Sequence, residues 1–326
     1  MDESAALVKK EAGHVFALNH DQLVVETFTE YLADWEAYCR LPEHAGTILW
    51  YPEDFNYVSL SEVEFSYWND LYLFMKLGER RSTRRFNLHK LDPVLRAEWV
   101  NWLLEVGQYL QLERSTTYQA GSLFDALYAS RPDMITHKTA QAIGLGCVLI
   151  ACKMEEIHAP TTTVLADLTH GRVDHKDILR LELRICSALN FQLKIPSICD
   201  WLNMYFELSG IFLHEHSIRS MRKRAYSTCS LALHSLGSML FSASSVAAAV
   251  YLSVLSAENL PLFRFITGYY SVELQSQVQW IRPYLESPYK ISFHYSVENH
   301  ESLSNQNGLA YAYVREQIER EYFCGF

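Results

Sequence analysis

The stretch GLGCVLIACKMEEIHAP, from Gly144 to Pro160, constrains the fold of this chain more than any other segment. It is almost wholly apolar up to Cys152, and many of its side chains and those just before it are small: Ala142, Gly144, Gly146, Cys147 and Ala151. Small side chains let neighbouring backbones approach closely. We therefore predict a central helix over residues 138–155, surrounded by other helices, with Lys153, Glu155 and Glu156 at its charged rim.

Helical periodicity extends along most of the chain, whereas strand alternation is hard to find, so the predicted fold class is all-α. A first set of helices is expected at residues 91–111, 115–130, 138–155, 160–171 and 174–190. A second set is expected at 197–208, 216–236, 244–258, 260–270 and 271–287, again with a small-residue helix, SSVAAAVYLSVLSAE. Pro93 suits a first helical turn, and Ser115 and Asp174 are predicted N-caps.

This pattern predicts two successive five-helix units, a structural repeat with little sequence identity between its halves. We divide the chain into an N-terminal extension (1–90, with a helix at about 59–77), a first unit (91–194), a second unit (195–289) and a C-terminal tail (290–326). The segment from Tyr38 to Tyr57 is rich in aromatic, proline and acidic residues and is expected to be irregular.

Two charges of the first unit fall on apolar helix faces. Arg96 shares a stripe with Val100 and Leu103, and Asp125 shares a face with Tyr118. A buried arginine needs a carboxylate, so an Arg96–Asp125 pair that joins the first two helices is the economical interpretation. The alternative is two solvated charges.

Lys153 and Glu182 form a second opposite pair, and each lies on a stripe with isoleucines. One interpretation is a second internal ion pair. The other is that both groups lie at the edge of an apolar surface, where they pair with each other and also bind a partner protein. Protein interfaces use apolar contact for affinity and polar groups for register.

At this point the residues resemble the cyclin family. LRAEWVNWLLEVGQYLQL is similar to the signature of the first cyclin-box helix, LFDALYAS to the second helix, and LIACKMEEIHAP to the third. ILRLELRICSALNFQLKIPSICDWLNMYFE resembles the fifth helix and the passage into a second box. The likeness covers residues 59–289 approximately, and it is weaker over the second box.

The resemblance implies a regulatory subunit, itself no enzyme, that binds and activates a cyclin-dependent kinase and recruits its substrates in cell-cycle control. Arg96 and Asp125 match the family's buried ion pair. The implied kinase-binding residues are Lys153, Glu182, Ile150, Met154, Leu183, Cys186, Phe191 and Leu193. The implied docking patch for substrates or inhibitors is Leu95, Glu98, Trp99, Trp102, Glu105, Ala140 and Gln141.

Three residues depart from the family pattern. Glu98 stands where the patch usually has an apolar residue, Trp99 where it has leucine, and Asn101 where it has aspartate. The first two bring ordinary Arg-x-Leu docking into question. Trp102 still offers an apolar floor, and Glu105 offers an acceptor for a docking arginine.

Other classes of function find little support. A net charge of −10 disfavours a nucleic-acid partner. Neither a membrane span nor a signal peptide is predicted. Seven scattered cysteines without a CxxC pair indicate reduced thiols of the cytosol or nucleus, and we expect a nuclear and cytoplasmic location. HExxH, GxxxxGK[ST], GxGxxG and GxSxG motifs are absent, so we predict no metal, cofactor or catalytic site.

Two basic clusters have more than one possible role. Residues 80–85 (RRSTRR) and 222–224 (RKR) fit a nuclear-import signal, a phosphate contact or a solvated face. The alternative function is a scaffold or transcription adaptor with the same double five-helix architecture that does not activate a kinase.

Overall fold

The computed structural model describes residues 62–82, 92–256, 259–289 and 309–318, which all lie in one compact unit, Pro52–Phe326. These residues are helical and contain no strand, which confirms the all-α class. The first set of helices is α4 (Pro93–Tyr109), α5 (Arg114–Ser130), α6 (Ala140–Glu155), α7 (Thr162–Asp167) and α8 (His175–Ala188). The predicted domain boundaries near 90 and 290 lie outside the described residues and stay predictions.

The second set repeats this order with an additional short helix. Its members are α9 (Ile198–Ser209), α10 (Glu215–Ala232), α11 (Gly237–Leu240), α12 (Ala243–Val254), α13 (Leu260–Thr267) and α14 (Gln275–Leu285). Short 3-10 turns, η2 (Pro132–Met134) and η4 (Ser271–Leu274), interrupt the loops. The N-terminal helix α3 (Glu62–Ser82) runs five residues beyond its predicted end, and residues 309–318 form a last helix.

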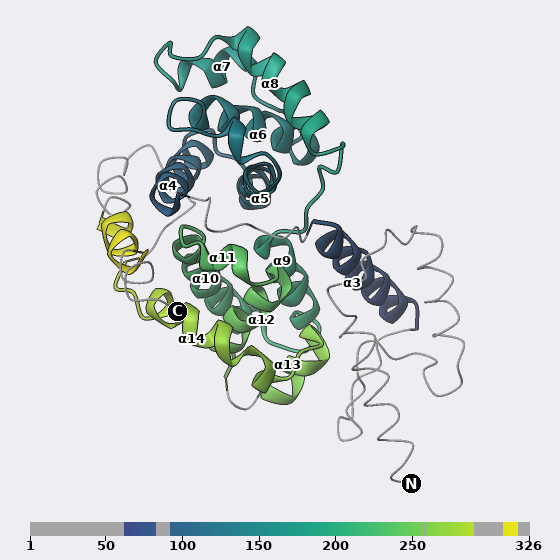
Figure 1. The fold of residues 1–326 in the computed structure, drawn as a ribbon. Helices are drawn as coiled ribbons and strands as arrows, with labels where there is room; N and C mark the ends of the chain where they lie inside the picture. The colour runs from purple at the N-terminus through teal and green to yellow at the C-terminus, as the bar shows by residue number, and fades with distance from the viewer. Residues whose placement is uncertain (1–61, 83–91, 257–258, 290–308, 319–326) are drawn as a thin grey trace. The chain divides into compact units, whose positions relative to one another are not determined.

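Each set is built around its small-residue helix. In Figure 1, α6 lies among the other helices of its set, and it contacts α4, α5, α7 and α8. In the same way α12 contacts α9, α10, α13 and α14. Every residue of α12 from Ser244 to Tyr251 is buried, which explains why alanine and serine dominate it.

Side chains cap the starts of some helices but not of others. Asp92 and Asp174 cap α4 and α8 through their side chains. The predicted cap at Ser115 is wrong, since α5 begins one residue earlier after Glu113, whose side chain does not cap it. The Glu156 carboxylate, at the end of α6, instead accepts hydrogen bonds from Glu113 N (2.8 Å) and Thr116 Oγ1 (2.6 Å). A carboxylate next to another helix thus satisfies one backbone amide at the start of α5, that of Glu113.

The Arg96 side chain is fully buried where the two sets meet. Its guanidinium donates to both carboxylate oxygens of Asp125, at 2.8 and 2.7 Å. Its Nη1 also donates to the carbonyl oxygens of Leu233, His234 and Ser235, which follow α10. One side chain therefore joins α4 and α5 to the second set.

Alanine at Gly144 is expected to destabilise the fold by about 1–3 kcal/mol, because a Cβ there would collide with the indole Nε1 of Trp99 and lie 3.2 Å from Trp102. Gly121→Ala is the matched control in α5, since its Cβ would meet only Leu103 Cδ2, at 3.6 Å. It should be neutral or stabilising. Urea unfolding followed by circular dichroism compares the two. Equal stability of both variants would contradict the close approach.

Candidate functional site

Lys153 and Glu182 meet at one edge of the first helical set. Lys153 is in the last turn of α6, and Glu182 is in the middle of α8. Lys153 Nζ donates to Glu182 Oε1 at 2.6 Å, and the two side chains are 48% and 21% exposed. An ion pair in contact with water adds little to folding stability, on the order of 0–1 kcal/mol. Its two charges instead remain available at the surface.

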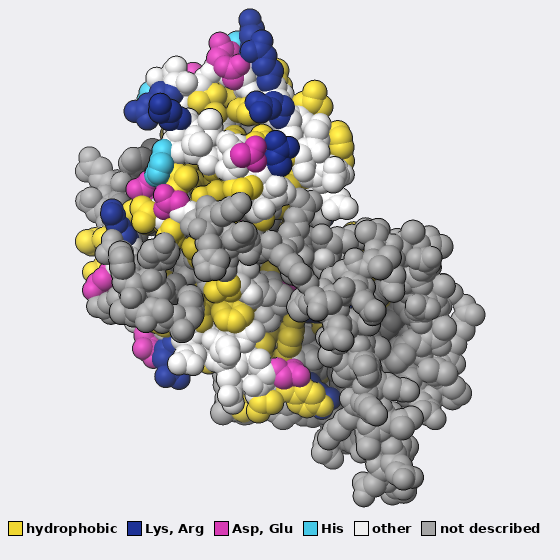
Figure 2. Space-filling view, viewed as in Figure 1, with side chains coloured by type: hydrophobic (Ala, Val, Ile, Leu, Met, Phe, Trp, Pro, Cys, Tyr) yellow, Lys and Arg dark blue, Asp and Glu magenta, His cyan; other side chains and the backbone are white. Residues whose placement is uncertain are grey.

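The two helices that carry this pair, and the residues just after them, also carry five exposed apolar side chains, which we call the α6–α8 shelf: Met154, Ile157, Leu179, Leu183 and Phe191. Leu183 is 65% and Phe191 66% exposed. Figure 2 shows hydrophobic side chains lying between basic and acidic ones over the first helical set. Exposed apolar side chains gathered next to a charged pair are typical of an interaction surface.

The amphipathic pattern of α8 produces the shelf. Ile178 and Ile185 are buried against the core, and α8 packs on α6. Leu179 and Leu183 are one turn apart on the other side, and Glu182 lies between the two faces at helical spacing. The sequence analysis missed Leu179 and did not assign Ile157 to the interface. The leucine spacing of i and i+4 away from the core stripe is the signal that would have found Leu179.

The other implied kinase-binding residues lie deeper. Ile150 and Cys186 are buried, and burial raises the pKa of the Cys186 thiol. Leu193 is half-buried, and its carbonyl oxygen accepts a hydrogen bond from Gln119 Nε2 at 2.5 Å. These three residues therefore offer a partner little surface or only part of their side chains.

The backbone after α8 turns Phe191 outward. Asn190 and Phe191 both have positive φ, 51° and 56°. This left-handed conformation costs an ordinary residue roughly 1–2 kcal/mol. Phe191 N donates to Cys186 O at 2.9 Å, which closes the turn. An exposed phenylalanine held in an unfavourable conformation suggests a role other than folding.

Residues next to Lys153 have structural partners that the sequence did not reveal. Glu155 accepts a hydrogen bond from Lys194 Nζ at 2.6 Å, and Lys194 is also 3.8 Å from Asp200 in α9. Glu156 holds the start of α5, as described above. The two carboxylates that follow Met154 therefore position the end of α6 and the chain leading to α9.

The implied docking patch is only partly open. Leu95, Trp99 and Ala140 are buried, and Trp99 stacks on Phe124 with ring centroids 3.7 Å apart. Trp102 and Gln141 are half-buried, and Glu98 and Glu105 are exposed. The accessible part of the patch is therefore one indole with two carboxylates on α4, together with Gln141 of α6.

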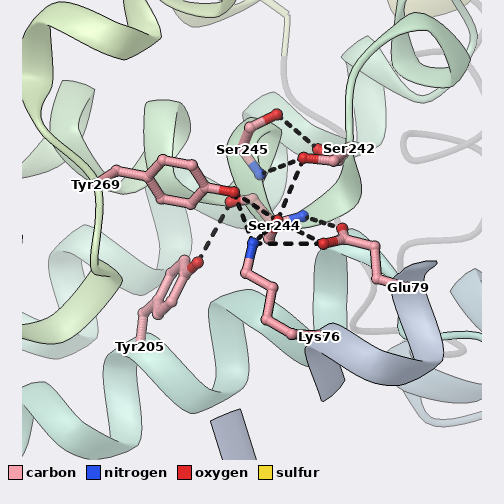
Figure 3. Close-up of polar contacts among 7 residues, drawn as sticks. All are labelled: Lys76, Glu79, Tyr205, Ser242, Ser244, Ser245 and Tyr269. Atoms are coloured by element: carbon pink, nitrogen blue, oxygen red, sulfur yellow. Dashed lines mark hydrogen bonds and ion pairs between the residues drawn. The ribbon is translucent and has the colours of Figure 1, made fainter. Parts of the chain in front are cut away.

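A second polar cluster joins α3 to the second helical set (Figure 3), and we call it the α3 clasp. Lys76 Nζ donates to Ser244 Oγ and to Tyr269 OH, each at 2.7 Å, and lies 3.5 Å from Glu79 Oε2. Ser244 also donates to Glu79 through its backbone N and its Oγ, each at 2.7 Å. Every group of the clasp has a partner, which is what a structural joint requires.

The charge of Lys76 is stabilised inside this cluster. Burial alone would lower its pKa, but the hydroxyls of Tyr72 and Tyr269 and the Glu79 carboxylate outweigh burial and raise it. The ammonium group also lies 5.1 Å from the centre of the Trp201 ring and 4.8 Å from that of Tyr269.

The remaining motifs show no catalytic arrangement. Among residues 62–82, 92–256, 259–289 and 309–318, no group of three His, Cys, Asp or Glu side chains is placed to hold a metal. In the basic cluster at 222–224, Arg222 pairs with Glu207 at 2.8 Å. Residues 83–85 of the 80–85 cluster lie outside the described residues. Within the described part of the chain, no helix has both the length and the apolar character needed to cross a membrane.

Comparison with known proteins agrees with this architecture. Residues 70–194 match the family model described as "Cyclin, N-terminal domain". G1/S-specific cyclin-E1 of Danio rerio is 30% identical over 226 residues, which is 68% of this chain and 54% of that protein. Cyclin-A2 of Xenopus laevis is 32% identical over 117 residues, 36% of this chain and 28% of that protein.

The chain belongs to the cyclin family. It spans about half the length of the cyclin-E1 relatives it matches. A viral cyclin from herpesvirus saimiri has the same fold, with a TM-score of 0.55 and 18% identity over 68% of this chain and 96% of that one.

Proposed function

We propose that this chain is the non-catalytic regulatory subunit of a cyclin-dependent serine/threonine kinase, which it binds, activates and helps to supply with substrates in cell-cycle control. The observation that carries the proposal is the Lys153–Glu182 pair at the edge of the α6–α8 shelf. Membership of the cyclin family and the similarity to relatives named G1/S-specific cyclin-E1 support it. A nuclear and cytoplasmic location is part of the same proposal.

In this mechanism the chain activates the kinase by binding to it and carries out no chemical step itself. The shelf offers apolar area to a mobile helix of the kinase, and Lys153 and Glu182 fix its register. In protein kinases the position of that helix controls the ion pair between the catalytic lysine and a glutamate. A subunit that binds the active arrangement more tightly shifts the population towards it. A stable complex should bury well over ~1,200 Å² in total.

Alanine at Lys153 or Glu182 is expected to weaken kinase binding by about thirtyfold or more, because the partner charge would be left buried and unpaired in the complex. Leu183→Ala should weaken it by about tenfold or more through lost apolar contact. The measurement is the Kd for a panel of purified cyclin-dependent kinases, together with histone phosphorylation.

Glu207→Ala is the matched control. Glu207 forms a 2.8 Å pair with Arg222 at the surface of the second helical set and should leave the Kd unchanged. If Lys153→Ala and Glu182→Ala bind like the wild type, the assigned surface is wrong. If the wild type binds and activates no kinase, the scaffold or adaptor function takes its place.

A further inference from the structure

The second helical set repeats the pair of helices that carries the α6–α8 shelf. In each set the small-residue helix packs directly on the last helix of that set, α6 on α8 and α12 on α14. By element order, the surface that α12 and α14 form together is therefore the counterpart of the shelf (Figure 1). The proposed function makes no use of this second surface.

A groove of about 350 Å³ lies on this counterpart surface, and we call it the α12–α14 groove. Its lining comes from α12, η4 and α14: Leu252, Ser271, Gln275, Val278, Gln279 and Arg282. The two apolar residues are half-buried, whereas the four polar ones are exposed. Val272, the residue after Ser271, is 69% exposed and adds apolar area in the same turn. Apolar side chains bordered by polar ones are typical of a protein interface.

Helix α14 supplies most of the groove from one face. Its four lining residues are spaced i, i+3, i+4 and i+7, while Ile281 and Tyr284 are buried on the core side. The first and last of the four positions are about 10 Å apart along the axis. Roughly three residues of extended chain span that distance. A glutamine amide both donates and accepts, so Gln275 and Gln279 suit the main chain of such a segment.

Arg282 is the only charged side chain among the described residues that line the groove. No carboxylate in the described part of the chain forms an ion pair with it, whereas the exposed Arg180 and Arg219 pair at 2.9 and 2.7 Å. In the neighbouring turn η4, the Glu273 carboxylate accepts a hydrogen bond from Tyr270 N at 2.8 Å. An unpaired guanidinium beside a groove, on a chain of net charge −10, complements an acidic ligand.

We propose that the α12–α14 groove docks an extended acidic segment of a partner protein. An apolar side chain of the segment packs on Leu252 and Val278, and Arg282 pairs with a carboxylate. Val278 and Arg282 are one turn apart, about 6 Å along the axis, so the carboxylate is about two residues from the apolar side chain. Gln275 and Gln279 hold the main chain. The inference goes beyond the proposed function, because it uses neither the shelf nor α4.

The test titrates the whole chain, without kinase, with three synthetic peptides. Each has a central leucine, and glutamate, glutamine or lysine stands two positions to either side of it. Binding is read by NMR from the methyl signals of Leu252 and Val278. The glutamate peptide should bind roughly two- to fivefold more tightly than the glutamine peptide, as one exposed ion pair allows, and the lysine peptide should bind most weakly. Added salt should reduce this preference.

Matched variants separate charge from structure, and each changes an exposed side chain. Arg282→Gln should abolish the preference for glutamate, Arg282→Lys should retain most of it, and Arg282→Glu should reverse it in favour of lysine. Alanine at both Gln275 and Gln279 should weaken all three peptides alike. Arg219→Gln is the control, since Arg219 pairs with Glu215 on the surface of α10, and it should bind like the wild type.

Three results would overturn the proposal. The first is that no peptide shifts the methyl signals of Leu252 and Val278, and the second is that the wild type binds all three peptides equally. The third is a preference for glutamate that survives in Arg282→Gln. None of these results bears on kinase binding, because the kinase is absent from the titration and the variants leave α6 and α8 unchanged.

Discussion

Replacing Arg96 by methionine is expected to remove about 3–5 kcal/mol of folding stability, because it leaves the Asp125 carboxylate without its counter-charge. Arg96 is fully buried, and its guanidinium reaches Asp125, three backbone carbonyls and Ser238 Oγ. The free energy of unfolding of a protein domain is only about 5–15 kcal/mol, so Arg96 accounts for a large share of it. Urea unfolding at neutral pH measures the loss.

Two further variants test the reason for this loss. Arg96→Lys should recover little, since an ammonium cannot reproduce the two parallel hydrogen bonds to Asp125. The double change Arg96→Met with Asp125→Leu should be more stable than Arg96→Met alone, because no charge is then left buried. Arg131→Ala is the control, since its pair with Asp133 is exposed, and it should leave stability almost unchanged. An Arg96→Met variant as stable as this control would contradict the prediction.

The Arg96 site also shows how much of the structure could be predicted from the sequence. A charge on an apolar stripe, with an opposite charge on the next helix, was enough to predict that Arg96 and Asp125 pair. The hydrogen bonds from Arg96 to the carbonyl oxygens of residues 233–235 could not be predicted. Every residue has a backbone carbonyl group, and the residue type does not show which of them accepts a hydrogen bond. The contact depends on how the second helical set docks.

The same distinction holds at the candidate sites. The resemblance placed Leu95, Trp99 and Ala140 in a docking patch. It matched sequence positions but could not show which side chains reach the surface, and all three are buried. The shelf was predicted only in part, since the resemblance gave Met154, Leu183 and Phe191, whereas Leu179 follows from the amphipathic pattern of α8. Lys76 and Glu79 look like an ordinary solvated pair at i and i+3. Their burial follows only from where α3 lies.

Lys76→Met is expected to release α3 from the second helical set, with a loss of about 3–5 kcal/mol in the free energy of holding it there. The change removes the ammonium group from the buried Glu79 carboxylate and from the rings of Trp201 and Tyr269. Hydrogen exchange of the α3 amides, read by mass spectrometry, measures the local loss, which should exceed the change in the α6 amides.

The control and the pH dependence make this prediction specific to the α3 clasp. Lys176→Met, at an exposed position in the first turn of α8, should leave α3 protected. Because folding raises the pKa of Lys76 above its ordinary value of 10.5, its stabilisation is fully present below that pH and is lost only as the pH rises through the folded value. After correction for intrinsic exchange rates, protection of α3 should therefore stay level from about pH 6 to pH 9 in the wild type. Protection in Lys76→Met that equals the wild type would mean that α3 is held by its apolar contacts, such as that of Tyr72 with Trp201, and that the clasp adds nothing.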